Sequence, residues 1–220
     1  RVLFRSQVHF AGLQVDGIVG GIDIRIDATD NPVDLETSDV DLAIRYTRPG
    51  HVGNEAVRLF GEQLTPVASP WLLKSGPPLR SPKDLANYAL LEASDSHRTQ
   101  NLEWLTWRRW LEDNWQPKLA PKRWMHFNYA HQIVQAALTG QGIALARMPL
   151  VADSLASGDL VEVLPNARID TPMVYWLLVG PRSGVRPEIQ AFCQWLTGQA
   201  ELTRLAIGDV PDADAGAHPD

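Results

Sequence analysis

Apolar and polar positions alternate with two different periods along this chain. Residues 22–27 alternate one by one, as in a strand with one covered face, whereas residues 40–44 form a compact apolar run typical of a parallel strand buried on both faces. Between them, Asn31 and Pro32 suit the cap and first turn of a short helix that ends near Ser38. This order predicts a β-α-β unit and therefore a parallel pair of strands.

Two extended stretches are longer than the strands around them. Residues 55–69 and 173–180 flank a second block of alternating strands and helices, and a final helix opens at Pro187. We therefore predict two α/β lobes joined by a pair of crossover strands, with a ligand cleft between the lobes and a hinge at the crossover. The predicted division is a separate start at residues 1–21, a first lobe of 22–62 plus 181–206, a second lobe of 63–180, and a disordered tail at 207–220.

Helical spacing and capping residues mark the other elements. Ser69 and Ser81 each precede a proline, a pattern typical of helix N-termini. Ser69 is therefore interpreted as an N-cap rather than as a nucleophile. Trp104, Trp107 and Trp110 fall at a spacing of three, which predicts a helix that packs its aromatic stripe into the core rather than one that stacks bases.

Composition and charge exclude several classes of function. The chain has 220 residues, a net charge of −6 and a single cysteine. An internal disulfide is therefore impossible, and direct binding to the phosphate backbone of a nucleic acid is not expected. No apolar run reaches membrane-spanning length. The six histidines show no metal-ligand spacing, and no glycine-rich phosphate loop or nucleophile motif follows a strand. We expect no enzyme, no metal, no cofactor and no contact with a membrane.

The first residues are set apart from the fold. Arg1–Ser6 resembles the in-frame translation of a sequencing adapter, and we interpret residues 1–21 as an artefact or a garbled remnant.

Several motifs occur in the same order as in a known family. They are Asp39-Val-Asp-Leu-Ala-Ile-Arg-Tyr46, Pro66-Val-Ala-Ser-Pro70, Pro82-Lys-Asp-Leu85, Phe127-Asn128, Gln135-Ala-Ala-Leu-x-Gly-Gln-Gly-Ile-Ala-Leu145, Leu155-x-x-Gly158 and Ala191-Phe-Cys-Gln-Trp-Leu196. Over about residues 22–200 the series resembles the effector-binding domain of LysR-type transcriptional regulators, in the subgroup of the glycine-cleavage activator.

The resemblance implies a fold, a setting and partners. The expected fold is α/β, a two-lobed type 2 periplasmic-binding-protein-like fold with two crossover strands and a first lobe truncated at its N-terminus. The expected protein is a bacterial cytoplasmic regulator that binds a small-molecule effector, forms a homodimer or homotetramer, and reaches DNA only through a winged helix-turn-helix that should precede this domain.

The resemblance also implies where an effector would lie. It places the effector against Thr29 and Asp30, against Arg45 and Tyr46, and against Phe127 and Asn128, with Arg147 as a further candidate. Strand ends of open α/β sheets are usual ligand sites, a helix N-terminus after Asn128 favours acceptor-rich ligands, and an arginine adds a charge-assisted bond. We therefore expect the effector to be an acidic metabolite. For each of these residues alone, a structural role in a turn or a helix cap is an equal alternative to a contact with the effector.

Two other functions fit the same architecture. A solute-binding protein of a transporter would need an export signal, and a transferase would need a catalytic set. The sequence upstream of residue 1 distinguishes these two classes from a regulator.

Overall fold

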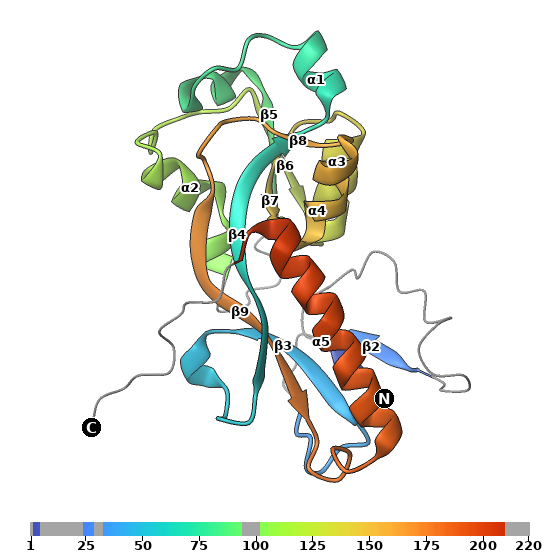
Figure 1. Ribbon diagram of the computed structural model, residues 1–220. Coiled ribbons are helices and arrows are strands. Elements are labelled where there is room, and N and C mark those ends of the chain that lie inside the picture. The colour runs from blue at the N-terminus through green and yellow to red at the C-terminus, as the bar shows by residue number, and fades with distance from the viewer. Residues whose placement is uncertain (1, 5–23, 29–32, 94–101, 210–220) are drawn as a thin grey trace.

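The fold is built on a single mixed β-sheet. The computed structural model describes residues 2–4, 24–28, 33–93 and 102–209 (Figure 1). Within these residues nine strands follow the order β2-β1-β3-β9-β4-β7-β5-β6, with β8 paired to β4. The strands are β1 Val2–Phe4, β2 Ile26–Ala28, β3 Leu42–Thr47, β4 Val57–Ala68, β5 Ala89–Ala93, β6 Arg123–Phe127, β7 Ile143–Arg147, β8 Val161–Glu162 and β9 Ile169–Val179.

Parallel pairing is confined to the two ends of the sheet. β1 pairs in parallel with β2 and β3, and β5 pairs in parallel with β6 and β7. The centre is antiparallel, because β9 pairs with β3 and β4, and β4 pairs with β7. The two long strands, β4 and β9, are therefore shared by both halves of the sheet, at the places where the sequence predicts crossover strands.

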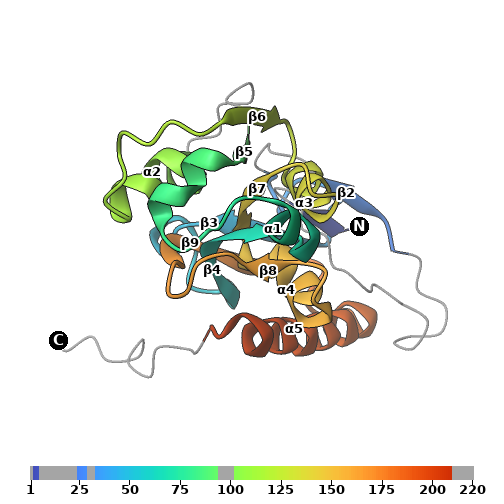
Figure 2. The same cartoon turned by 90° about the horizontal axis from the view of Figure 1, so that it is seen from above.

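Helices cover both faces of the half that contains β5, β6 and β7. Figure 2 shows α2 on one side of β5, β7 and β4, and α3 and α4 on the other. Figure 1 shows α5 running from the β3 end of the sheet to the middle of β4. The helices are α1 Pro70–Ser75, α2 Trp107–Asp113, α3 Ala130–Leu138, α4 Met148–Ser157 and α5 Pro187–Ile207, with short 3-10 turns η2 Pro49–His51, η3 Pro82–Asn87 and η4 Leu102–Leu105.

The ends of these helices follow from local chemistry. Ser69 caps α1 by accepting a hydrogen bond from the Leu72 backbone N–H at 3.4 Å, so its predicted role as an N-cap is confirmed. The Asp84 carboxylate accepts from the Ser81 backbone N–H at 2.9 Å at the start of η3. Gly158 ends α4 with a φ of 79°, in the left-handed region that favours glycine.

Strand alternation separates two apolar clusters. On β7, Ala144 and Ala146 face the larger cluster with α3, α4 and α5, whereas Ile143 and Leu145 face a second cluster with α2. Trp107 and Trp110 of α2 are fully buried in the second cluster, so the core role predicted for them is confirmed. Trp104, predicted on the same helical stripe, instead lies before α2 in η4, half-buried, with the guanidinium groups of Arg48 and Arg109 over its ring.

Three elements near the ends of the chain differ from the sequence prediction. Residues 33–38, the described part of the helix predicted to end near Ser38, hold only a turn, because the Asp34 carboxylate accepts from the Glu36 N–H and competes with helix formation. Residues 2–4, which the sequence analysis sets apart, form β1 between β2 and β3. α5 continues to a buried Ile207, followed by Gly208 and Asp209, which the sequence analysis assigns to the tail.

Candidate functional site

A polar cluster lies in the core where the halves of the sheet meet. It contains Tyr46 from β3, Glu62 from β4, Tyr175 from β9 and Arg147 from the end of β7. Arg147 Nε donates to Glu62 Oε1 at 2.5 Å, and the Tyr175 hydroxyl donates to the same oxygen at 3.2 Å. The Tyr46 hydroxyl donates to Glu62 Oε2. One carboxylate thus receives hydrogen bonds from three strands.

Aromatic packing holds the cation in place. The Arg147 Cζ atom lies 4.3 Å from the centroid of the Tyr46 ring, and its Nη2 donates to the Tyr175 hydroxyl. The rings of Tyr46 and Tyr175 are 4.8 Å apart. A guanidinium over an electron-rich ring is attracted by the ring quadrupole, which adds to its pairing with Glu62.

Burial makes the charges of this cluster interdependent. The Glu62 side chain is 0% exposed and the Arg147 side chain 10%. Burial alone lowers the pKa of the Arg147 guanidinium, but the Glu62 carboxylate outweighs it, and the pKa lies above its ordinary value. Burial, followed by the Glu62 carboxylate, raises the pKa of the Tyr46 hydroxyl well above its ordinary value. The arginine therefore stays charged and the phenol neutral at physiological pH.

The residues predicted for the site do not all gather in one place. Tyr46 and Arg147 meet at Glu62, as described above. Arg45 projects to the opposite face of β3, where its Nη2 lies 3.5 Å from the Val33 carbonyl oxygen. The structure does not describe Thr29 and Asp30.

The second predicted contact region lies at the end of β6. Phe127 is half-buried and packs against the apolar cluster that also contains Tyr46. Asn128 follows it with an exposed side chain, and Tyr129 is the N-cap residue of α3. Asn128 is therefore near a helix N-terminus, where backbone N–H groups favour an anion.

Sequence reasoning missed Glu62 and Tyr175. A signal for Glu62 was available, because a single carboxylate in the middle of a long apolar strand needs a buried partner. Nothing in the sequence pairs Glu62 with Arg147, which lies 85 residues further along the chain.

Within the part of the chain that the structure describes, no group of three or more His, Cys, Asp or Glu side chains could hold a metal ion. Among the same residues, no helix is both long and apolar enough to cross a membrane.

Comparisons with known proteins agree with this architecture. The model of the LysR substrate binding domain family matches residues 20–201. The glycine cleavage system transcriptional activator of Escherichia coli K12 is 33% identical over 180 residues, which are 82% of this chain and 56% of the relative. The HTH-type transcriptional activator AmpR of Pseudomonas aeruginosa is 31% identical over 182 residues, 82% of this chain and 57% of the relative. The chain thus spans about half the length of the curated relatives it matches, and both are named as regulators rather than enzymes.

Solved structures give the same answer for the fold. The effector domain of AmpR from Pseudomonas aeruginosa has a TM-score of 0.65 and 26% identity, over 94% of this chain and 97% of that one. The regulatory domain of CrgA from Neisseria meningitidis, at 18% identity, has a TM-score of 0.63 over 90% of this chain and 97% of that one, a likeness of fold alone. The family expected from the ordered motifs is therefore confirmed: the chain belongs to the LysR substrate-binding domain family.

Proposed function

We propose that this chain is the effector-sensing domain of a LysR-type transcriptional regulator in the bacterial cytoplasm. A small acidic metabolite binds between a first lobe of residues 22–62 plus 181–206 and a second lobe of residues 63–180. DNA is bound by a winged helix-turn-helix elsewhere in the protein, and the domain assembles as a homodimer or homotetramer. Family membership, together with two relatives that regulate transcription, supports this function over a transporter's solute-binding protein.

The observation that carries the proposal is the shared pair of central strands. β4 and β9 pair with each other, and each also pairs with a strand of a different half of the sheet. A change in the angle between the halves therefore has to pass through these two strands. An effector that binds one angle better than another shifts the population toward that angle, and the oligomer transmits the shift to the spacing of the DNA-binding domains.

The proposed effector contacts combine charge and backbone donors. Arg45 and Tyr46 lie on β3, with Phe127, Asn128 and the first turn of α3 in the other half of the sheet. We include Thr29, Asp30 and Arg147 in the site by resemblance. The charge of Arg147 is balanced inside the protein by Glu62, so it orients the site, whereas the amides after Asn128 supply the attraction for a carboxylate. Arg45, whose side chain lies on the opposite face of β3 against the Val33 carbonyl, has to leave that contact and turn toward the cleft to add its charge.

Calorimetry tests both the site and the chemistry of the effector. The chain is titrated with a panel of organic acids, amino acids and neutral sugars. We expect heat with one or more carboxylates, and at least tenfold weaker binding in Arg45→Gln, which corresponds to about 1.4 kcal/mol. Arg80→Gln, at an exposed arginine before η3, is the matched control and should bind as the parent does. Heat only with neutral or cationic compounds would contradict an acidic effector.

The regulatory part of the proposal needs the full-length protein. We expect the intact regulator to retard its promoter DNA in a gel, with a change in the retarded pattern when the effector found by calorimetry is added. An intact gene that encodes no DNA-binding domain would contradict this part.

A further inference from the structure

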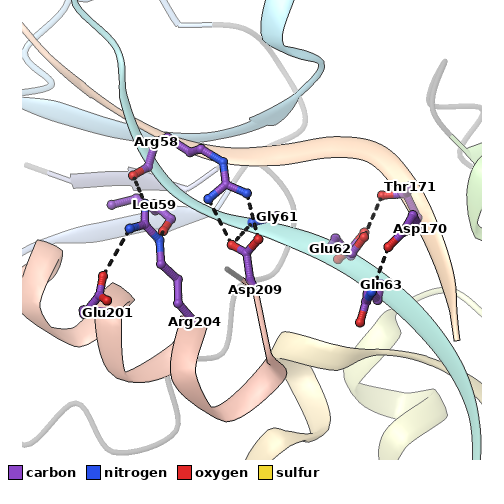
Figure 3. Close-up of polar contacts among 10 residues, drawn as sticks. All are labelled: Arg58, Leu59, Gly61, Glu62, Gln63, Asp170, Thr171, Glu201, Arg204 and Asp209. Carbon is purple, nitrogen blue, oxygen red and sulfur yellow. Dashed lines mark hydrogen bonds and ion pairs between the residues drawn. The ribbon is translucent and has the colours of Figure 1, made fainter. Parts of the chain in front are cut away.

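The last turn of α5 and Asp209, which follows the helix, attach to β4 through two charged side chains (Figure 3). Arg204 donates from Nε to the Leu59 carbonyl oxygen at 2.6 Å and from Nη2 to the Arg58 carbonyl oxygen at 2.9 Å. Asp209 accepts from both terminal nitrogens of Arg58, at 3.0 and 2.8 Å, and from the Gly61 backbone N–H at 2.8 Å. The side chains of Asp209 and Arg58 are 16% and 33% exposed, so the pair is largely shielded from solvent.

These contacts fall on the one irregular stretch described in the pairing of β4 with β9. The register between the two strands shifts between Arg58 and Phe60 and again between Gly61 and Gln63. Glu62 lies inside the second shift, next to the amide that Asp209 holds. Register decides which face of a strand a side chain occupies, so fixing the backbone at Gly61 fixes the direction of the Glu62 carboxylate.

The same turn of α5 is also attached to the other side of the crossover. Arg168, just before β9, donates from Nη1 to the Ile207 carbonyl oxygen at 3.2 Å. Arg168 also pairs with Glu162 of β8, with an Nη2 to Oε1 distance of 2.6 Å. The end of α5 therefore connects the irregular part of β4 with the segment that enters β9.

A close approach at Gly61 makes this arrangement possible. A Cβ atom at this position would lie 3.0 Å from Arg58 Nη2 and 3.3 Å from Asp209 Oδ1. A side chain at residue 61 would therefore press on both charged groups, whereas glycine lets the Asp209 carboxylate reach the backbone.

We propose that Asp209 is a positioning residue for the buried Glu62–Arg147 pair: together with Arg58 it fixes the irregular stretch of β4 in the register that turns Glu62 toward Arg147. The end of α5 is then part of the sensing machinery, because it acts on the crossover strands without contacting the cluster. The positioning role concerns the chain without ligand; only its consequence for effector binding rests on the proposed function.

Nuclear magnetic resonance of the ligand-free chain tests this role. The Arg147 side-chain Nε–H resonance, assigned by its loss in Arg147→Lys, reports the contact with Glu62 directly. In Asp209→Asn we expect this resonance to move and the Gly61 amide to exchange with solvent at least tenfold faster, while amides of β5 and β6 keep their rates. A general loss of stability would instead raise exchange throughout the sheet.

Two further variants complete the test. Asp170→Asn neutralises an exposed carboxylate that accepts a 2.7 Å hydrogen bond from Gln63 on the same part of β4 (Figure 3), and should leave the Arg147 resonance in place. Arg58→Lys keeps the charge but loses the two-pronged contact, and should move the resonance by less than Asp209→Asn does; it decides the question if Asp209→Asn does not fold.

Three results would overturn the positioning role. They are an unmoved Arg147 resonance in a folded Asp209→Asn or Arg58→Lys chain, an equal movement in Asp170→Asn, and faster exchange spread evenly over β5 and β6. Because no ligand is present, failure of the effector titrations leaves this result unaffected, and the two proposals can fail separately.

Discussion

The Arg147 guanidinium meets the Glu62 carboxylate with 2.5 Å between Nε and Oε1, and Glu62 is fully buried. Removing two charges from water is costly, and the cost is recovered only where hydrogen bonds satisfy both groups. Here the hydroxyls of Tyr46 and Tyr175 donate to the same carboxylate. The pair is therefore balanced as a unit, and each member depends on the other.

Removing the carboxylate should be strongly destabilising. Glu62→Gln leaves the Arg147 charge buried without its partner, and we expect it to lower the free energy of unfolding by about 3 kcal/mol. Urea denaturation at neutral pH measures the change. Glu201→Gln, whose partner Arg204 lies 3.1 Å away at an exposed carboxylate, is the matched control and should stay within about 0.5 kcal/mol of the parent. A loss in Glu62→Gln no larger than in this control would contradict the prediction.

The coupling between Glu62 and Arg147 can also be measured with a double-mutant cycle. Because Glu62→Gln already removes the anion, removing the cation as well should cost little more. The double variant Glu62→Gln/Arg147→Gln should therefore lose less stability than the sum of the two single variants, by at least about 1 kcal/mol. Urea denaturation of the parent, the two single variants and the double variant measures this difference. Additive losses would show that the two side chains do not interact.

The sequence predicts most of the architecture because its signals are local. Strand β3, the long strands β4 and β9, and α3 follow from apolar period and length, and the cap at Ser69 follows from a short motif. The start of β9 at Ile169 was missed, because residues 169–172 are polar or half-exposed and lack a continuous apolar run.

The candidate site is less predictable, because it depends on contacts between distant residues. Tyr46 and Arg147 were predicted as polar residues at the carboxyl ends of apolar strands, but their meeting at Glu62 requires pairing across three strands. The role of Asp209 is hidden for the same reason: its partner Arg58 lies 151 residues away. A tail rich in Asp, Ala and Gly predicts disorder by composition, and only tertiary contacts place Asp209 against β4.

The buried tyrosine hydroxyls of the cluster should ionise late in an alkaline titration followed by ultraviolet absorbance. The pKa of Tyr175 is raised, by burial first, and also by Glu62, although Arg147 opposes the shift. A raised folded-state pKa means that the stabilisation is complete below the unfolded-state value of about 10 and is lost as pH rises through the folded-state value. We expect the ultraviolet signal of Tyr46 and Tyr175 to appear only with alkaline unfolding. Tyr175→Phe should remove one late-titrating group, and an unchanged late signal in that variant would contradict the assignment.

The aromatic core of α2 should dominate the stability of its half of the sheet. Trp107 is fully buried, and its Nε1 donates to the Leu91 carbonyl oxygen at 2.9 Å. Its ring packs edge-on against Trp110, with 5.4 Å between centroids. Trp107→Ala should therefore lower the free energy of unfolding by about 3–5 kcal/mol. Trp115, which is 88% exposed, supplies the control: Trp115→Ala should change it by less than about 1 kcal/mol.

Acid should weaken the contact between α5 and β4. Burial alone raises the pKa of Asp209, but hydrogen bonds from Arg58 and from the Gly61 N–H outweigh it, so the pKa lies below its ordinary value. A lowered folded-state pKa gives stability that is present above the unfolded-state value of about 4 and is lost as pH falls through the folded-state value.

Asp209→Asn isolates this contribution. At neutral pH the variant should be less stable than the parent by about 1.5 kcal/mol, the scale of a charged hydrogen bond. The difference should shrink as pH is lowered from about 6 to about 3, because the parent loses the interaction that the variant already lacks. Asp170→Asn, which neutralises an exposed carboxylate in contact with the same strand, should stay within about 0.5 kcal/mol of the parent at neutral pH. A difference between Asp209→Asn and the parent that is constant across this range would mean that the carboxylate charge does not hold α5 on β4.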